Sequence, residues 1–186
     1  MRIITLSLPT PNPYFVGAYF LSITYIYLVR KGIIFVAAIF LLSTINPAEA
    51  VTGTHGEILS VSKTTAIKSG DVLTVSGKNF DQTVGIYVAM CKITVASALP
   101  TPCGGGADKT GKLGASYWIS SNPPSYGRGS AIPFKAHGSF SISLKVSPMI
   151  ETLDCRKTPC AVYVRADHTR TQDRTHDLYV PLSFSK

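Results

Sequence analysis

The segment 165–177 (RADHTRTQDRTHD) gathers side chains that could do chemistry, with three Arg, three Asp and two His whose charges nearly cancel. The donors that could serve a metal ion or a hydrolytic His–Asp pair are Asp167, His168, His176 and Asp177. Their spacing matches no metal-binding signature, so we expect no metal here. The cations that could contact an anionic ligand are Arg165, His168, Arg170 and His176. The plainer interpretation, which we favour, is a loop between two strands that is held by Arg–Asp pairs and capped turns.

A second group of candidates is aromatic and lies in the stretch 103–137, which is rich in Gly, Ser and Pro. Trp118, Tyr117 and Tyr126 could form a stacking platform for a flat ligand or a sugar, with Phe134 beside them. A Trp of a β-sandwich can equally pack in the core, and both readings stay open. A connection this long is usually functional or disordered, and its aromatic residues favour a packed surface loop.

The signals of several other function classes are missing from the sequence. Serine is abundant, but there is no G-x-S-x-G motif and no nucleophile with an evident base, so we expect no enzyme. There is no glycine-rich phosphate loop and no basic stripe with interleaved aromatic residues, so we expect neither a cofactor nor direct nucleic-acid binding. His55 and His137 flank expected strands and should face solvent.

The four cysteines are Cys91, Cys103, Cys155 and Cys160. An even number in an exported chain predicts two disulfides, for which three pairings are possible. Sequence neighbours would close the shortest loops, and each bridge would stabilise the domain by roughly 2–3 kcal/mol. A zinc site is disfavoured because no C-x-x-C pair is present.

The elements that would position these residues are strands, because apolar and polar residues alternate with a period of two throughout the second half of the chain. The expected strands are 58–62, 73–75, 84–91, 116–119, 140–146, 160–164 and 178–184. Pro181 suits an edge strand, since proline has no amide hydrogen for a ladder. Seven short strands, each burying one face, predict an antiparallel two-sheet sandwich.

Residues 1–50 have the features of an export segment. An apolar run at 14–29 is followed by Arg30-Lys31, a second apolar run at 33–42, and small residues at Ala48 and Ala50. Residues 30–50 have the layout of a signal peptide that is cleaved after Ala50. If translation starts near Val29, residues 1–28 are not part of the protein and the start codon has been misassigned. The alternative is a retained two-run membrane anchor. We therefore expect a domain at 51–186 that is secreted or held at the cell surface.

Residues 51–186 carry 15 basic and 9 acidic side chains, a net charge of +6. This charge favours acidic surfaces and polyanions, although it also serves solubility. We expect a monomer that contacts a membrane only through residues 1–50.

Five motifs carry a resemblance to a known family. They are 69–80 (SGDVLTVSGKNF), 85–91 (GIYVAMC), 138–140 (GSF), the D-C-x4-C block that starts at Asp154, and 180–184 (VPLSF). Together they resemble the neocarzinostatin apoprotein family over residues 57–184. The most specific part is the D-C-x4-C block in combination with the G-x-Y-V-x-x-C strand.

The resemblance implies a seven-stranded immunoglobulin-like sandwich with Cys91–Cys103 and Cys155–Cys160 disulfides, secreted by actinomycete-type bacteria. Members of that family carry a reactive enediyne chromophore in a cleft and release it to cut DNA, so the protein is an antibiotic carrier and not a catalyst. Two departures point to a rebuilt ligand face: residues 147–153 look too short for the ribbon that walls the family's cleft, and 112–134 is extra.

The function that we expect is therefore a non-catalytic binding protein for a polycyclic aromatic small molecule. One alternative is a surface module that binds an envelope polymer or a protein partner. Another is a haem-uptake accessory module, as similar chains occur beside haem-uptake domains, with His168, His176 or a Tyr as axial ligand.

Overall fold

The structure is a computed structural model that describes residues 23–30, 33–40, 48–105 and 113–186. The chain divides into two compact units, Met1–Ile45 and Asn46–Lys186. In the first unit, β1 (Ile23–Arg30) pairs antiparallel with β2 (Ile33–Phe40), from Ile23 opposite Phe40 to Arg30 opposite Ile33. No helix among the described residues is long and apolar enough to cross a membrane. The expected signal layout at 41–47 and most of 1–28 lie outside the described residues.

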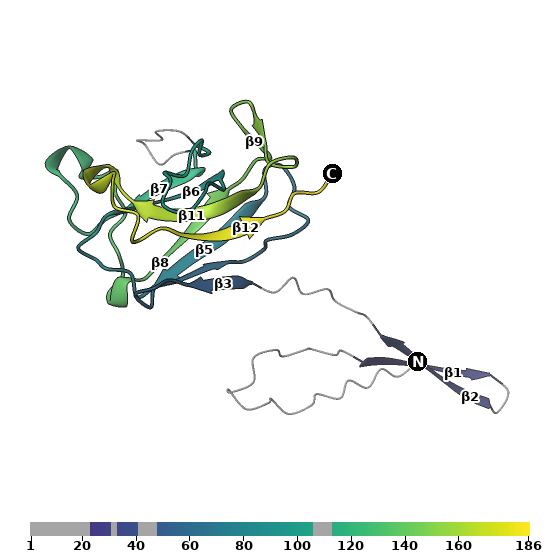
Figure 1. Cartoon of the computed structure of the whole chain (residues 1–186). Coiled ribbons are helices and arrows are strands. Elements are labelled where there is room, and N and C mark those ends of the chain that lie inside the picture. Colours follow the sequence, from purple (N-terminus) through teal and green to yellow (C-terminus); the bar gives the residue numbers. More distant parts are fainter. Residues whose placement is uncertain (1–22, 31–32, 41–47, 106–112) are drawn as a thin grey trace. The chain divides into compact units, whose positions relative to one another are not determined.

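The second unit is an antiparallel sandwich of two four-stranded sheets (Figure 1). The first sheet has the order β3-β4-β5-β8, with β3 at Glu49–Thr52, β4 at Ile58–Val61, β5 at Val72–Lys78 and β8 at Phe140–Lys145. The second has the order β12-β11-β6-β7, with β12 at Leu178–Leu182, β11 at Cys160–Ala166, β6 at Ile86–Lys92 and β7 at Ser116–Ile119. A small ribbon pairs β9 (Met149–Ile150) with β10 (Leu153–Asp154). Three single 3-10 turns are η1 (Ser125–Gly127), η2 (Ala136–Gly138) and η3 (His168–Arg170).

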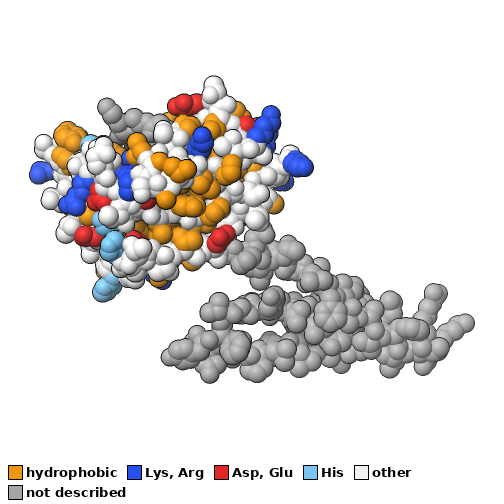
Figure 2. Space-filling model, in the orientation of Figure 1, with side chains coloured by type: hydrophobic (Ala, Val, Ile, Leu, Met, Phe, Trp, Pro, Cys, Tyr) orange, Lys and Arg blue, Asp and Glu red, His pale blue; other side chains and the backbone are white. Residues whose placement is uncertain are grey.

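Alternation builds the core between the two sheets. Along β8, Phe140, Ile142 and Leu144 are buried while the residues between them are exposed. Residues of β5 and of β11 join the same apolar cluster from opposite sheets, so each sheet buries one face against the other. On the face shown in Figure 2, apolar side chains lie over β11 and β12, and charged side chains lie around them.

The all-β antiparallel prediction is confirmed, but the predicted count of seven strands is too low. All seven expected strands occur, as β4 to β8, β11 and β12, and the described part of this unit adds β3, β9 and β10. Pro181 lies in β12 at an edge of its sheet, as expected. The expected cut after Ala50 falls inside β3, where Ala50 is opposite Ser60 of β4.

The segment 147–153 also differs from expectation. Instead of an unpaired connection, it holds two strands of two residues each, which pair across a turn at 151–152.

Two disulfides join sequence neighbours. Cys91–Cys103 ties β6 to the loop that follows it, and Cys155–Cys160 ties the end of the ribbon to the start of β11. Bridges of this kind are typical of proteins from oxidising compartments.

Candidate functional site

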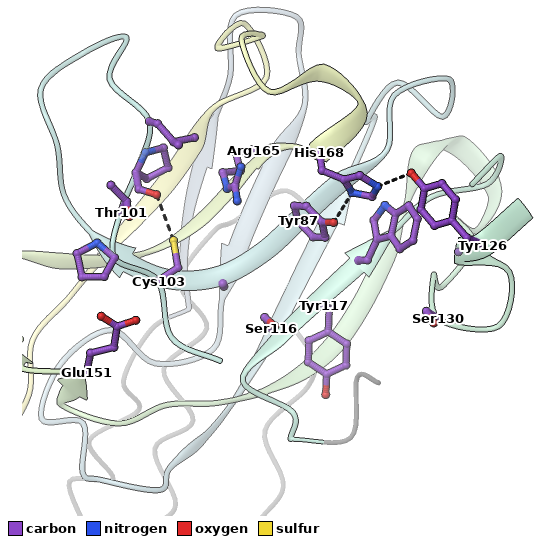
Figure 3. Close-up of a pocket in the computed structure, with 16 residues that line it drawn as sticks. Tyr87, Thr101, Cys103, Ser116, Tyr117, Tyr126, Ser130, Glu151, Arg165 and His168 are labelled. Atoms are coloured by element: carbon purple, nitrogen blue, oxygen red, sulfur yellow. Dashed lines mark hydrogen bonds between the residues drawn. The ribbon is translucent and has the colours of Figure 1, made fainter. Parts of the chain in front are cut away.

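A pocket of about 870 Å³ opens on the outer face of the β12-β11-β6-β7 sheet (Figure 3). Because Ile86 and Val88 of β6 point into the core, Tyr87 and Ala89 point outward to form part of its floor. Trp118 of β7 and Arg165 of β11 extend this floor on either side of β6. The floor therefore depends on the register of three paired strands.

One end of the pocket is aromatic and is organised around His168 of η3. The Nδ1 atom of His168 lies within hydrogen-bond distance of the Tyr87 hydroxyl, and its Nε2 atom is 2.8 Å from the Tyr126 hydroxyl. The ring of His168 meets the Trp118 ring edge-on, with centroids 5.0 Å apart. Since neutral imidazole has one donor and one acceptor nitrogen, one tyrosine donates to this ring and the other accepts from it.

The buried carboxylate of Asp167 fixes this aromatic group from below. Its Oδ2 accepts a hydrogen bond from Trp118 Nε1 at 2.8 Å, while Oδ1 accepts from the Thr169 amide at 2.8 Å and from the Thr169 hydroxyl at 2.6 Å. Asp167 therefore caps η3 and orients the indole at once. Gly85 is required here, because a Cβ at that position would lie 2.0 Å from Asp167 Oδ2.

Arg165 is the half-buried cation of the pocket. Its guanidinium carbon lies 5.3 Å from the centre of the Tyr87 ring, in a cation–π arrangement. Burial, followed by repulsion from Arg174, lowers the pKa of Arg165, and burial raises the pKa of Tyr87. Within the described ranges, Arg165 forms no ion pair with a carboxylate. An anionic group in the pocket would thus meet a partly desolvated cation.

The opposite end of the pocket is formed by the loop 99–103 and by the tip of the β9–β10 ribbon. Cys103 brings the first disulfide to the pocket wall, and Glu151 lies across from it in Figure 3. Leu99 is 45% exposed and adds an apolar surface on this side. The ligand face is therefore mixed: aromatic at one end, apolar and acidic at the other.

Five of the eight candidate ligand residues line the pocket. They are Tyr117, Trp118, Tyr126, Arg165 and His168. Tyr117 also packs against the core, and its hydroxyl donates to the Ser143 carbonyl at 2.8 Å. Trp118 is half-buried, lines the pocket and donates to Asp167, and it belongs to neither apolar core cluster of the described residues, so it does not pack in the core.

The other three candidates lie elsewhere. Phe134 is only 8% exposed and packs against Phe140 in the core, because the chain after Ile132 turns inward. Arg170 is exposed at the end of η3 and His176 lies further along the loop, and neither lines the pocket.

The expected structural role of 165–177 is present in the structure. Arg174 pairs with Asp177 at 3.1 Å, and Asp173 Oδ1 accepts from the Thr175 amide at 2.9 Å. The four donors that could have formed a metal site there do not group together: among the described residues, the group with metal-binding geometry is His55, Glu57 and His176.

Sequence reasoning missed several of these residues. Tyr87 could have been found, because the alternation that buries Val88 places its neighbour on the opposite face. Asp167 was considered only as a metal or catalytic ligand, and its hydrogen bond to a Trp 49 positions away leaves no local sequence signal. Glu151 and the grouping of His55 with His176 depend on loops that come together only in the folded domain.

No family model matches this chain, and no curated protein matches it. Among solved structures, the chain is similar to macromomycin, with a TM-score of 0.44 and 15% sequence identity over 69% of this chain and 99% of macromomycin. At this level of similarity the family stays a resemblance, and any ligand must be inferred from the pocket itself.

Proposed function

We propose that this protein is an exported, non-catalytic binding protein whose pocket holds an aromatic small molecule with an acidic group. The observation that supports this most is the position of half-buried Arg165 beside the aromatic group of Tyr87, Trp118 and His168. A flat ring can stack on such side chains, while a carboxylate can accept paired hydrogen bonds from the guanidinium. The volume of about 870 Å³ is in the usual range for a small-molecule site.

The arrangement of His168 supports binding rather than catalysis. Both ring nitrogens contact tyrosine hydroxyls, so this imidazole is not paired with a serine that it could activate. Ser116 and Ser130 also line the pocket, and no basic side chain of the described residues is hydrogen-bonded to either of them. We therefore propose that the ligand leaves the pocket chemically unchanged.

The fluorescence of Trp118, the single tryptophan of the chain, tests this proposal. A matched pair of probes, anthracene-9-carboxylate and its neutral carboxamide, separates stacking from charge recognition. We expect both probes to quench Trp118, with the carboxylate binding about tenfold more tightly because a hydrogen bond to a charged group contributes roughly 1.5–3 kcal/mol. Arg165→Met should abolish this preference and leave the binding of the carboxamide unchanged.

Arg170→Met is the matched control, because Arg170 is an exposed cation of η3, shortly after β11, and lies outside the pocket. It should retain the preference for the carboxylate. A wild-type protein that binds neither probe at millimolar concentration contradicts the proposed function, and equal binding of the two probes contradicts the role of Arg165.

Haem binding is a second candidate, favoured by the contact between Tyr126 and His168. A tyrosine can bind ferric haem, and an imidazole that accepts its hydroxyl proton would favour the tyrosinate form. Titration of ferric haem should then shift the Soret band, and Tyr126→Phe should remove the shift. A spectrum that stays that of free haem excludes this candidate.

Export is part of the proposal and is supported by the two disulfides and by the signal-like layout of residues 30–50. N-terminal sequencing of the protein from its own cells should give Val51.

A further inference from the structure

Two turns from opposite sheets bring three metal-binding side chains together at one end of the sandwich. His55 and Glu57 lie in the turn between β3 and β4, and His176 lies in the loop between β11 and β12. One donor atom from each of the three residues lies within 4.8 Å of the other two. The two histidine rings are 5.8 Å apart between centroids. Figure 2 shows histidine side chains beside acidic ones at this end.

The carboxylate of Glu57 is buried, with a side-chain exposure of 5%. Both polar contacts that the described residues give it come from His55: the amide donates to Oε2 at 3.0 Å, and ring Nδ1 lies 3.7 Å from Oε1. Among the described residues no donor lies within hydrogen-bond distance of Oε1, so this oxygen can take a further partner. A bound cation would supply the missing interaction.

The turn that carries Glu57 holds the carboxylate in place. The Gly53 amide donates to the Glu57 carbonyl at 2.8 Å, and Gly56 adopts a positive φ of 84° that closes the turn. The Glu57 side chain folds back over Gly53, where a Cβ would lie 2.4 Å from Oε1. This close approach explains why a glycine occupies position 53.

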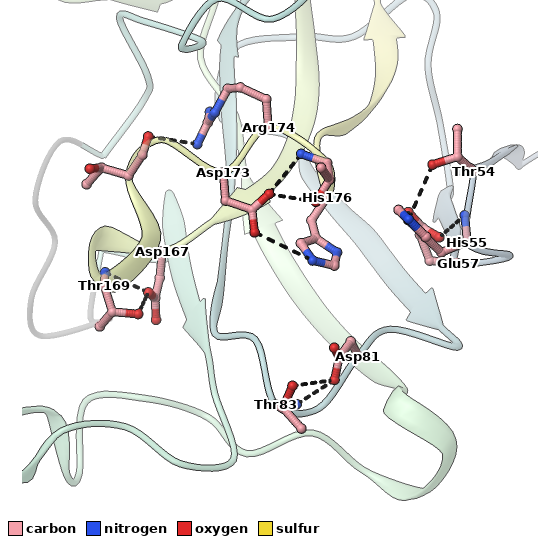
Figure 4. A network of polar contacts seen from close by, with 12 residues as sticks. Thr54, His55, Glu57, Asp81, Thr83, Asp167, Thr169, Asp173, Arg174 and His176 are labelled. Atoms are coloured by element: carbon pink, nitrogen blue, oxygen red, sulfur yellow. Dashed lines mark hydrogen bonds and ion pairs between the residues drawn. The ribbon is translucent and has the colours of Figure 1, made fainter.

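His176 is held from the other side by Asp173. Its Nε2 atom is 3.7 Å from Asp173 Oδ2, while Asp173 Oδ1 is occupied by Thr175 (Figure 4). In metal sites, the ring nitrogen that does not bind the ion usually donates to a carboxylate, and Asp173 is placed to take that role. The amide and the hydroxyl of Thr175 donate to Asp173 Oδ1 at 2.9 and 2.6 Å and hold this carboxylate in place.

We infer that His55, Glu57 and His176 form a binding site for a divalent zinc-type ion. Imidazole and carboxylate donors in a two-to-one ratio suit zinc, which commonly takes three protein ligands and a water in a tetrahedral arrangement. Zinc bonds of about 2.0–2.1 Å place ligand atoms roughly 3.3 Å apart, so the donors would have to move together by about 1.5 Å. The His55 side chain is 60% exposed and would make most of that movement, giving up the contact of its Nδ1 with the Thr54 hydroxyl at 3.3 Å.

A bound ion would connect the turn of one sheet to a loop of the other. Since β3 and β12 are edge strands of their sheets, the ion would fasten both edges at this end of the sandwich. The site shares no residue with the lining of the pocket, so it does not depend on the proposed ligand.

Titration of the full chain, after removal of metals with a chelator, tests the site. We expect calorimetry to show one Zn²⁺ per chain and Co²⁺ to give visible bands of a tetrahedral site with nitrogen and oxygen ligands. His176→Ala and Glu57→Gln should each weaken zinc binding at least tenfold, and Asp173→Asn should weaken it about tenfold through loss of orientation. Zinc should also raise the thermal unfolding midpoint of the wild type.

His137→Asn is the matched control, because His137 lies outside the cluster and Asn tolerates its positive φ of 58°. It should bind zinc as the wild type does. If Glu57→Gln does not fold, His55→Ala changes an exposed side chain and gives the same test. Zinc binding weaker than millimolar, or binding that survives both His176→Ala and His55→Ala, overturns the site.

Discussion

Two buried carboxylates, Asp167 and Glu57, show how differently the two regions are built. Asp167 beneath the pocket is 2% exposed and accepts three hydrogen bonds, from the indole of Trp118 and from the amide and hydroxyl of Thr169. Glu57 is 4% exposed and accepts one, from the His55 amide. Both oxygens of Asp167 accept hydrogen bonds, whereas no described residue donates a hydrogen bond to Oε1 of Glu57.

The two regions also differ in the elements that position their side chains. Strands in register place Tyr87, Trp118 and Arg165, so the pocket floor is fixed by backbone pairing. Turns place His55 and His176, and hydrogen bonds within each turn do the positioning. The pocket should therefore respond to changes in the sheet that leave the zinc site intact, and this separation can be tested.

Loss of the first disulfide should have the largest effect. Cys91→Ser with Cys103→Ser should lower the free energy of unfolding by roughly 3 kcal/mol, because the bridge closes a loop of 12 residues. The same change should weaken the binding of anthracene-9-carboxylate in the pocket and leave the affinity for zinc unchanged. Urea unfolding, probe quenching and zinc calorimetry measure the three effects.

Cys155→Ser with Cys160→Ser is the comparison, since its loop spans 5 residues and neither cysteine lines the pocket. This double variant should lower the free energy of unfolding by roughly 2 kcal/mol and leave the binding of anthracene-9-carboxylate unchanged. If the two double variants weaken the binding of the probe equally, the Cys91–Cys103 disulfide does not shape the pocket wall.

Replacing each of the two buried carboxylates by its amide tests the difference between Asp167 and Glu57. Asp167→Asn should lower the free energy of unfolding by about 1–3 kcal/mol, because the amide cannot accept all three hydrogen bonds. Glu57→Gln without zinc should cost much less, because the amide oxygen of Gln can keep the single hydrogen bond from the His55 amide. Urea unfolding in chelator measures both, and equal costs would contradict the distinction between the two carboxylates.

A third carboxylate, Asp71, gives the smallest expected effect and lies outside both regions. A hydrogen bond from Lys63 at 2.8 Å and one from the Lys68 amide lower the pKa of Asp71. Its contribution to stability is therefore present above its unfolded pKa of about 3.9 and is lost as the pH falls through the lower folded value. Unfolding midpoints between pH 5 and 2 should fall less steeply for Asp71→Asn than for the wild type, with probe and zinc binding at neutral pH unchanged.

The fold was predictable where alternation is long enough to be read. The regular pattern of 140–146 gives β8, and that of 178–184 gives β12 at an edge. β9 and β10 have two residues each, too few for a pattern, and β3 coincides with small residues that indicate a cleavage site. Short strands depend on their partners, and those partners are distant in the sequence.

The candidate site was predictable only in part, for a related reason. Trp118, Arg165 and His168 attract attention by residue type, and strand pairing does bring them together. His55 and His176 are 121 positions apart, and either one alone is an ordinary polar residue of a turn. Their contact follows from the packing of two loops, which no local pattern encodes.

The pairing of β3 also limits when the cut that we expect after Ala50 could be made. Glu49 and Ala50 are opposite Val61 and Ser60 of β4, so the expected processing point is part of a sheet in the folded domain. A protease that reads an extended chain needs that backbone free, and a cut after Ala50 therefore belongs to the interval before β3 docks. Once β3 has paired with β4, the cut could no longer be made. A purified chain that still begins before Glu49 would then indicate that folding preceded cleavage, and a chain that begins at Val51 would indicate the reverse order.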